Sequence, residues 1–148
     1  MNESAVHAVM TEARSCAVVM LESASFIQSE LANVRMNDAL RTHTEQICTA
    51  LIGTKHDIIT EVDELDELID SDVSASDIHS KVNLLVGWLR NDITKIHQLV
   101  MALQSASKQD PACMDACVLV TESTTNILNA ITRTRAAADS LRAEADET

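Results

Sequence analysis

The sequence is poor in residues that form turns and in aromatic residues. Its 148 residues include two glycines, one proline, one tryptophan, one phenylalanine and no tyrosine. A sheet of many short strands needs a turn after each strand, so this shortage disfavours such a sheet and favours a few long helices. Hydrophobic residues still make up 46% of the chain, so we expect a core of small and aliphatic side chains.

Basic side chains are also scarce. The chain has 11 lysines and arginines against 23 acidic residues, which gives a net charge of −12. Proteins that bind nucleic acid or anionic lipid use cationic side chains to offset phosphate charge, so we expect no nucleic acid partner. No run of about 18 uncharged apolar residues is present, so we expect no membrane insertion. A basic protein partner would fit the charge.

The four cysteines are too few for a disulfide-rich secreted scaffold. They predict reduced thiols and a cytoplasmic location. The sequence has no glycine-rich phosphate loop, no dinucleotide fingerprint and no Ser-His-Asp order, so we expect neither an enzyme nor a cofactor. The one catalytic alternative that stays open is phosphotransfer through His79.

Apolar and small residues recur every three or four positions in four segments, a spacing that keeps one stripe of each helix against its neighbours. The seam of the first segment is Val6, Met10, Ala13, Ala17, Met20, Ala24, Ile27, Leu31 and Val34. The seam of the third segment is Ile78, Val82, Leu85, Leu89, Ile93, Ile96, Val100 and Leu103. The first and last seams are rich in small residues, so we expect close approach of their backbones.

Short polar stretches separate the four segments. Ser74 or Ser76 is placed to cap the third helix, and Asp110 followed by Pro111 is placed to start the fourth. We predict helices at about 3–34, 37–70, 75–107 and 111–146 in a single domain, residues 1–148. Short connections make neighbouring helices antiparallel, so the predicted fold is all-α, an antiparallel up-down-up-down four-helix bundle with long helices. Two helical hairpins that assemble as a homodimer are the alternative.

Strong heptads without a catalytic signature favour a non-catalytic interaction module. Heptads indicate that helices associate, and the same pattern serves within one chain and between chains. We therefore expect a scaffold or signalling adaptor that binds a protein partner through its helix faces.

The first alternative function is a soft-metal site near one end of the bundle. Antiparallel packing would bring six side chains toward this end: Cys48, Cys113, Cys117, His43, His97 and Met101. Spacing of four residues places Cys113 and Cys117 on one helix face. Thiolate, imidazole and thioether groups suit copper or zinc. The Cys113–Cys117 pair also resembles the paired cysteines that line the bundles of bacterial copper-storage proteins.

The second alternative is histidine phosphotransfer. The stretch DIHSKVNLLVGWLR, residues 77–90, resembles the phosphoacceptor box of histidine-kinase dimerisation helices and their phosphotransferase relatives. The resemblance implies that His79 accepts a phosphoryl group on the exposed side of a bundle, with Asn83 one helical turn away. It also implies that three leucines pack inward: Leu84, Leu85 and Leu89.

Two further stretches have structural interpretations. Gly87 lies inside a predicted helix, where glycine costs about 1 kcal/mol relative to alanine, so we expect close helix packing there, with a ligand cavity as the alternative. The acidic run EVDELDELIDSD, residues 61–72, lacks the glycine and the oxygen spacing of a calcium loop. We interpret it as a solvated, acidic helix end.

Overall fold

The structure is a computed structural model that describes residues 3–71 and 74–146, with side chains up to Glu144. Its elements are α1 (Glu3–Glu30), η1 (Leu31–Asn33), α2 (Asp38–Asp70), α3 (Ala75–Gln109), η2 (Pro111–Cys113) and α4 (Met114–Asp146), where η denotes a 3₁₀ helix. The predicted all-α class is confirmed. The first predicted helix differs most from the observed one, because the chain tightens into η1 after Glu30 and becomes extended at Val34.

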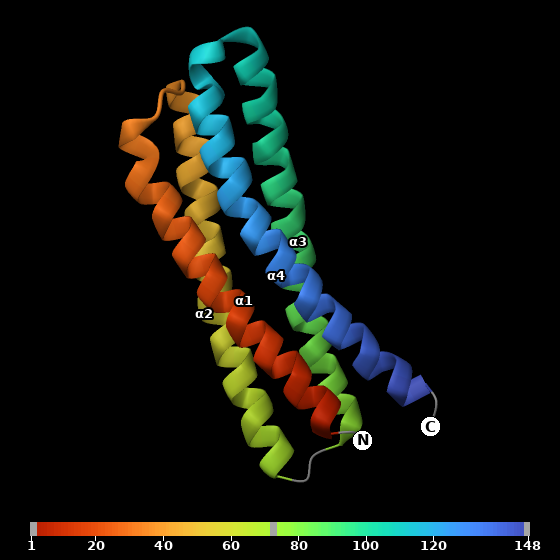
Figure 1. Cartoon of the computed structure of the whole chain (residues 1–148). Coiled ribbons are helices and arrows are strands. Elements are labelled where there is room, and N and C mark those ends of the chain that lie inside the picture. Colours follow the sequence, from red (N-terminus) through yellow and green to blue (C-terminus); the bar gives the residue numbers. More distant parts are fainter. Residues whose placement is uncertain (1–2, 72–73, 147–148) are drawn as a thin grey trace.

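The four long helices run alternately in opposite directions (Figure 1). The α1–α2 and α3–α4 connections lie at one end of the bundle, and the N-terminal end of α1 and the C-terminal end of α4 lie at the other. α1 packs against α2 and α4, and α3 packs against the same two helices. The arrangement is the predicted antiparallel up-down-up-down bundle.

Small and aliphatic side chains form one core between the helices. The first predicted seam is buried from Val6 to Leu31, and Val34 is half-buried. The backbones of α1 and α4 lie close together over more of their length than those of α2 and α3. The alanines on the α1 seam explain this approach, because interaxial distance depends on the side chains at the contact. Among the helices of residues 3–71 and 74–146, none combines the length and the apolar character that a bilayer span requires.

Polar side chains cap the helices. Asn37 caps α2 and Ser74 caps α3, each by accepting a hydrogen bond from a backbone amide three residues further on. Asp110 caps η2, with Pro111 in the first turn, as the sequence predicts. These side chains satisfy amides that have no carbonyl partner within their own helix. The helix starts are therefore fixed locally, and the connections stay short.

The two glycines do not mark close packing. Gly53 and Gly87 are both exposed, and a Cβ atom added at either position would have no heavy atom within 4 Å. The expected close approach of a neighbouring helix at Gly87 is therefore wrong. The glycine there carries the helix-propensity cost without a contact that requires it.

Basic side chains from other helices bind the acidic second half of α2. Arg14 of α1 lies 2.6 Å from Asp66. Lys81 of α3 lies 2.6 Å from Glu64 and 3.3 Å from Glu61, which is buried. This part of the acidic run therefore links α2 to its neighbours and is not simply a solvated helix end. Residue 72, the last of the run, lies outside the described residues.

Candidate functional site

The predicted phosphoacceptor lies near the start of α3. His79 is half-buried, and Asn83 is exposed one turn further on. Leu85 and Leu89 are in the core as predicted, whereas Leu84 is 50% exposed, so the expectation that it packs inward is wrong. Successive residues of a helix are rotated by about 100°, which turns Leu84 away from the side that Leu85 faces. Phosphotransfer through His79 stays a prediction.

The structure disperses the side chains of the predicted soft-metal site between core and surface. The buried side chains are Cys48, Cys113 and Cys117, the half-buried one is His43, and the exposed ones are His97 and Met101. In the part of the chain that the structure describes, no three His, Cys, Asp or Glu side chains are arranged to hold a metal ion. Copper or zinc binding stays a prediction, and titration of the reduced protein with either ion would test it.

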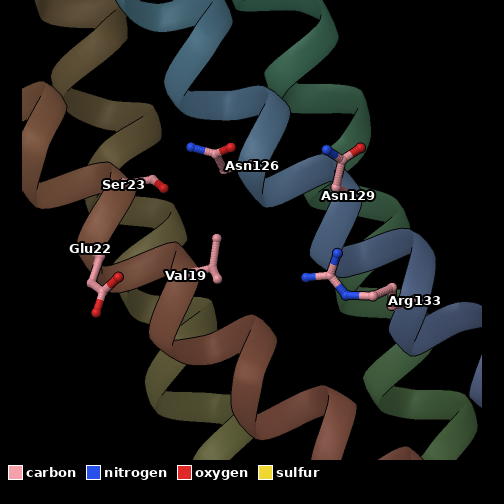
Figure 2. Close-up of a pocket in the computed structure, with 6 residues that line it drawn as sticks. All are labelled: Val19, Glu22, Ser23, Asn126, Asn129 and Arg133. Carbon is pink, nitrogen blue, oxygen red and sulfur yellow. The ribbon is translucent and has the colours of Figure 1, made fainter.

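A polar groove made of two hollows that share residues runs between α1 and α4, and Figure 2 shows the first hollow. Six side chains line its first hollow, of about 260 Å³: Val19, Glu22, Ser23, Asn126, Asn129 and Arg133. Its second hollow, of about 320 Å³, shares three of these and adds three others: Phe26, Glu122 and Ser123. Figure 2 shows that α1 and α4 each supply one wall of the first hollow. These nine residues define the α1–α4 groove.

Two serine hydroxyls in the α1–α4 groove have no hydrogen-bond partner among the described residues. Ser23 is 9% exposed and Ser123 is 7% exposed. Within residues 3–71 and 74–146, neither side chain makes a hydrogen bond, whereas the buried Thr124 and Thr134 donate to the carbonyl four residues back. Figure 2 shows the Ser23 hydroxyl pointing from α1 toward α4. Neither serine oxygen is among the fully buried atoms of the described residues that lack a partner, so both hydroxyls remain open to solvent. A bound molecule can therefore replace water as their hydrogen-bond partner.

The two ends of the α1–α4 groove differ in charge. At one end, Nε of Arg133 lies 3.6 Å from the carboxylate of Glu12. At the other end, Glu22 and Glu122 line the same hollow, and no lysine, arginine or histidine of the described residues forms an ion pair with either. Phe26, the one phenylalanine of the sequence, lies beside them and is 53% exposed. This end therefore combines unneutralised negative charge with an accessible aromatic ring.

A second polar feature lies inside the core, near the middle of the bundle. It comprises one residue from each long helix, and we call it the central polar layer: Cys16, Thr54, Asp92 and Thr134. Asp92 is 1% exposed, and its Oδ2 atom has no hydrogen-bond partner among the described residues. Burial raises the pKa of the Asp92 carboxyl, and a hydrogen bond with Thr54 partly offsets that rise. The layer is therefore a polar defect in the core, because one of its carboxylate oxygens is buried without a partner.

The thiols of Cys16 and Cys48 are protonated at neutral pH. Burial raises the pKa of Cys16 to about 12, although a hydrogen bond with Thr134 acts in the opposite direction. Burial also raises the pKa of Cys48 to about 11. Because the thiolate is the nucleophile and the metal ligand, neither thiol is prepared for covalent chemistry or for metal binding without losing a proton.

Neither the α1–α4 groove nor the central polar layer is predicted from the sequence. The predicted seam of the third segment passes through Ile93, yet the strict alternation of steps of three and four from Leu85 through Leu89 leads to Asp92. That alternation is the signal that could have placed the carboxylate in the core. The groove residues lie beside the seams, where polar side chains are ordinary, so no comparable signal marks them.

Comparisons with protein-family models, with curated proteins and with solved structures give no match. The geometry and chemistry of the α1–α4 groove are therefore the basis for a functional proposal.

Proposed function

We propose that the chain is a non-catalytic interaction module, a scaffold or adaptor that binds a partner protein in the α1–α4 groove. The observation that carries the proposal is that Ser23 and Ser123, two largely buried residues that line one groove, have hydroxyls without an intramolecular hydrogen bond. Both hydroxyls are free of intramolecular hydrogen bonds and open to solvent, so they are available to a partner bound in the groove.

The remaining side chains of the groove suit a polypeptide. Asn126 and Asn129 follow each other along α4, and each side-chain amide can both donate and accept, as a peptide backbone requires. Val118 precedes Glu122 by one helical turn and is 45% exposed, and Phe26 lies nearby in the second hollow. Apolar anchors beside hydrogen-bonding groups are typical of protein–protein interfaces.

Site-specific photo-crosslinking in the cells that naturally express the protein tests the proposal. A photoreactive amino acid at Asn126 or Asn129 should form a discrete covalent adduct with one partner protein, because these positions line the occupied groove. The matched control is Asn83, an exposed asparagine on α3. The same photoreactive residue there should give no such adduct.

Three results would contradict the proposal. Equal labelling at all three positions would indicate contact without a preferred surface. The absence of an adduct at both groove positions would indicate that nothing occupies the groove in the cell. An adduct with twice the mass of the chain would identify a second copy as the occupant and would contradict a separate partner.

A further inference from the structure

We propose that the Phe26 end of the α1–α4 groove binds one lysine or arginine side chain of the partner, with its cationic group between the carboxylates of Glu22 and Glu122. This inference rests on the function proposed above, because it specifies which chemistry the partner presents to the groove. We call this end of the groove the cation pocket, and six residues line it: Glu22, Ser23, Phe26, Glu122, Ser123 and Asn126.

The charge of the cation pocket is the first support. Elsewhere in the bundle, the chain supplies its own cations to paired carboxylates, since Arg14 binds Asp66 and Lys81 binds Glu64. Glu22 and Glu122 come from different helices and meet at one hollow, and no cation of the described residues forms an ion pair with them. A cation from outside would gain charge-assisted hydrogen bonds with these carboxylates.

The uncharged walls of the pocket are the second support. The ring of Phe26 is 53% exposed beside the two carboxylates, which permits a cation to lie over its face. Ser23 and Ser123 are more than nine-tenths buried as residues, and their hydroxyls, which make no intramolecular hydrogen bond, can accept hydrogen bonds from an ammonium or guanidinium group. A metal ion would not use the ring in this way, so the combination favours an organic cation.

The size of the pocket sets the scale of the ligand. Its volume of about 320 Å³ is at the lower end of the range of roughly 300–1,000 Å³ found for small-molecule sites. One extended side chain fits this size, and the rest of the partner would continue along the amides of the groove. The net charge of −12 adds long-range attraction for a basic segment.

Titration of the isotope-labelled full chain, followed by NMR, tests the cation pocket. The probes are N-acetyl-arginine amide and N-acetyl-lysine amide, and N-acetyl-citrulline amide is the neutral match for arginine. At least one cationic probe should give saturable shifts confined to the groove residues, and citrulline should give none. Glu22→Gln with Glu122→Gln should weaken binding about tenfold or more, because the charge-assisted hydrogen bonds are lost.

Two further variants give the test its specificity. Phe26→Leu keeps an apolar side chain but removes the ring, and it should weaken binding a few-fold. Glu45→Gln with Glu67→Gln removes the same charge from exposed positions on α2 and should leave binding unchanged. Equal weakening by this control pair, shifts spread over the acidic surface, or no saturable shifts would overturn the inference.

The outcome also separates this inference from the proposed function. If the Glu22→Gln and Glu122→Gln variant still forms the adduct at position 126 in full yield, the cation pocket is wrong and the docking groove stands. If adducts fail at position 126 in the unmodified background, the docking groove itself is wrong.

Discussion

Replacing Asp92 with leucine should raise the free energy of unfolding at neutral pH by about 1–3 kcal/mol. Asp92 is 1% exposed in the core, and its Oδ2 atom has no hydrogen-bond partner among the described residues. Replacing the carboxyl therefore removes a desolvation cost that hydrogen bonds do not fully offset, and it adds apolar contact. Thr54 keeps a partner in the variant, because its hydroxyl lies 3.1 Å from the carbonyl of Ala50. Urea unfolding of the two proteins measures the difference.

The control for this prediction is Asp57→Leu on the facing helix. Asp57 is exposed, so its replacement should change the free energy of unfolding by no more than about 0.5 kcal/mol. If Asp92→Leu destabilised the protein more than Asp57→Leu does, the carboxyl of Asp92 would be a satisfied part of the core, and the polar defect described above would not exist.

The pH dependence of the Asp92→Asn variant checks the same carboxyl. Burial raises the pKa of Asp92 above its ordinary value of 3.8, Asp57 raises it further, and the Thr54 hydrogen bond and Lys95 lower it. Cys16 also faces the carboxyl, but it is neutral at these pH values. Below pH 3.8 the carboxyl is protonated in both states, so its charge costs the native state nothing. As the pH rises, the Asp92 carboxyl ionises in the unfolded chain at a lower pH than in the native state. Between these two pKa values the free energy of unfolding of the wild type should therefore fall relative to that of Asp92→Asn.

Leu85→Ala should lower the free energy of unfolding by about 2–5 kcal/mol, the range for a leucine deleted from a packed core. Leu85 is 0% exposed and faces the core seam of α3. The adjacent Leu84 has the same side chain and is 50% exposed, so Leu84→Ala is the matched control and should cost no more than about 1 kcal/mol. Thermal and urea unfolding measure both values.

The contrast between neighbouring leucines tests the rotation of α3 about its own axis. Similar losses in the two variants would mean that both leucines are half-buried, which this bundle does not permit. A larger loss for Leu84→Ala would mean that α3 turns its other side to the core, and the placement of Asp92 in that core would then also be wrong.

The heptads of the sequence were enough to predict the fold. Steps of three and four residues identify the stripe that each helix buries, and the seam from Val6 to Leu31 is buried throughout. The starts at Ser74 and Asp110 were also predictable, since capping chemistry is local. These features depend on neighbours in the sequence, so the sequence alone contains them.

The candidate site depends on relations between helices and was not predictable in the same way. Glu22 and Glu122 are 100 residues apart in the sequence and face one hollow because α1 and α4 lie side by side. Which of two outward polar positions turns toward the neighbouring helix depends on the rotation of each helix. The unpartnered state of Ser23 and Ser123 depends on that rotation as well. Asp92 is the exception, since the heptad alternation reaches it.

The most direct test of a docking groove is to remove its two serine hydroxyls and to measure stability and partner contact in the same protein. The Ser23→Ala and Ser123→Ala variant should be as stable as the wild type or more stable by about 1 kcal/mol, because alanine has the higher helix propensity. Its photo-crosslinking at position 126 should nevertheless decline, because the partner loses both hydrogen bonds. A variant that lost stability while keeping its full yield of adduct would show that the serines serve the fold, and it would contradict the account.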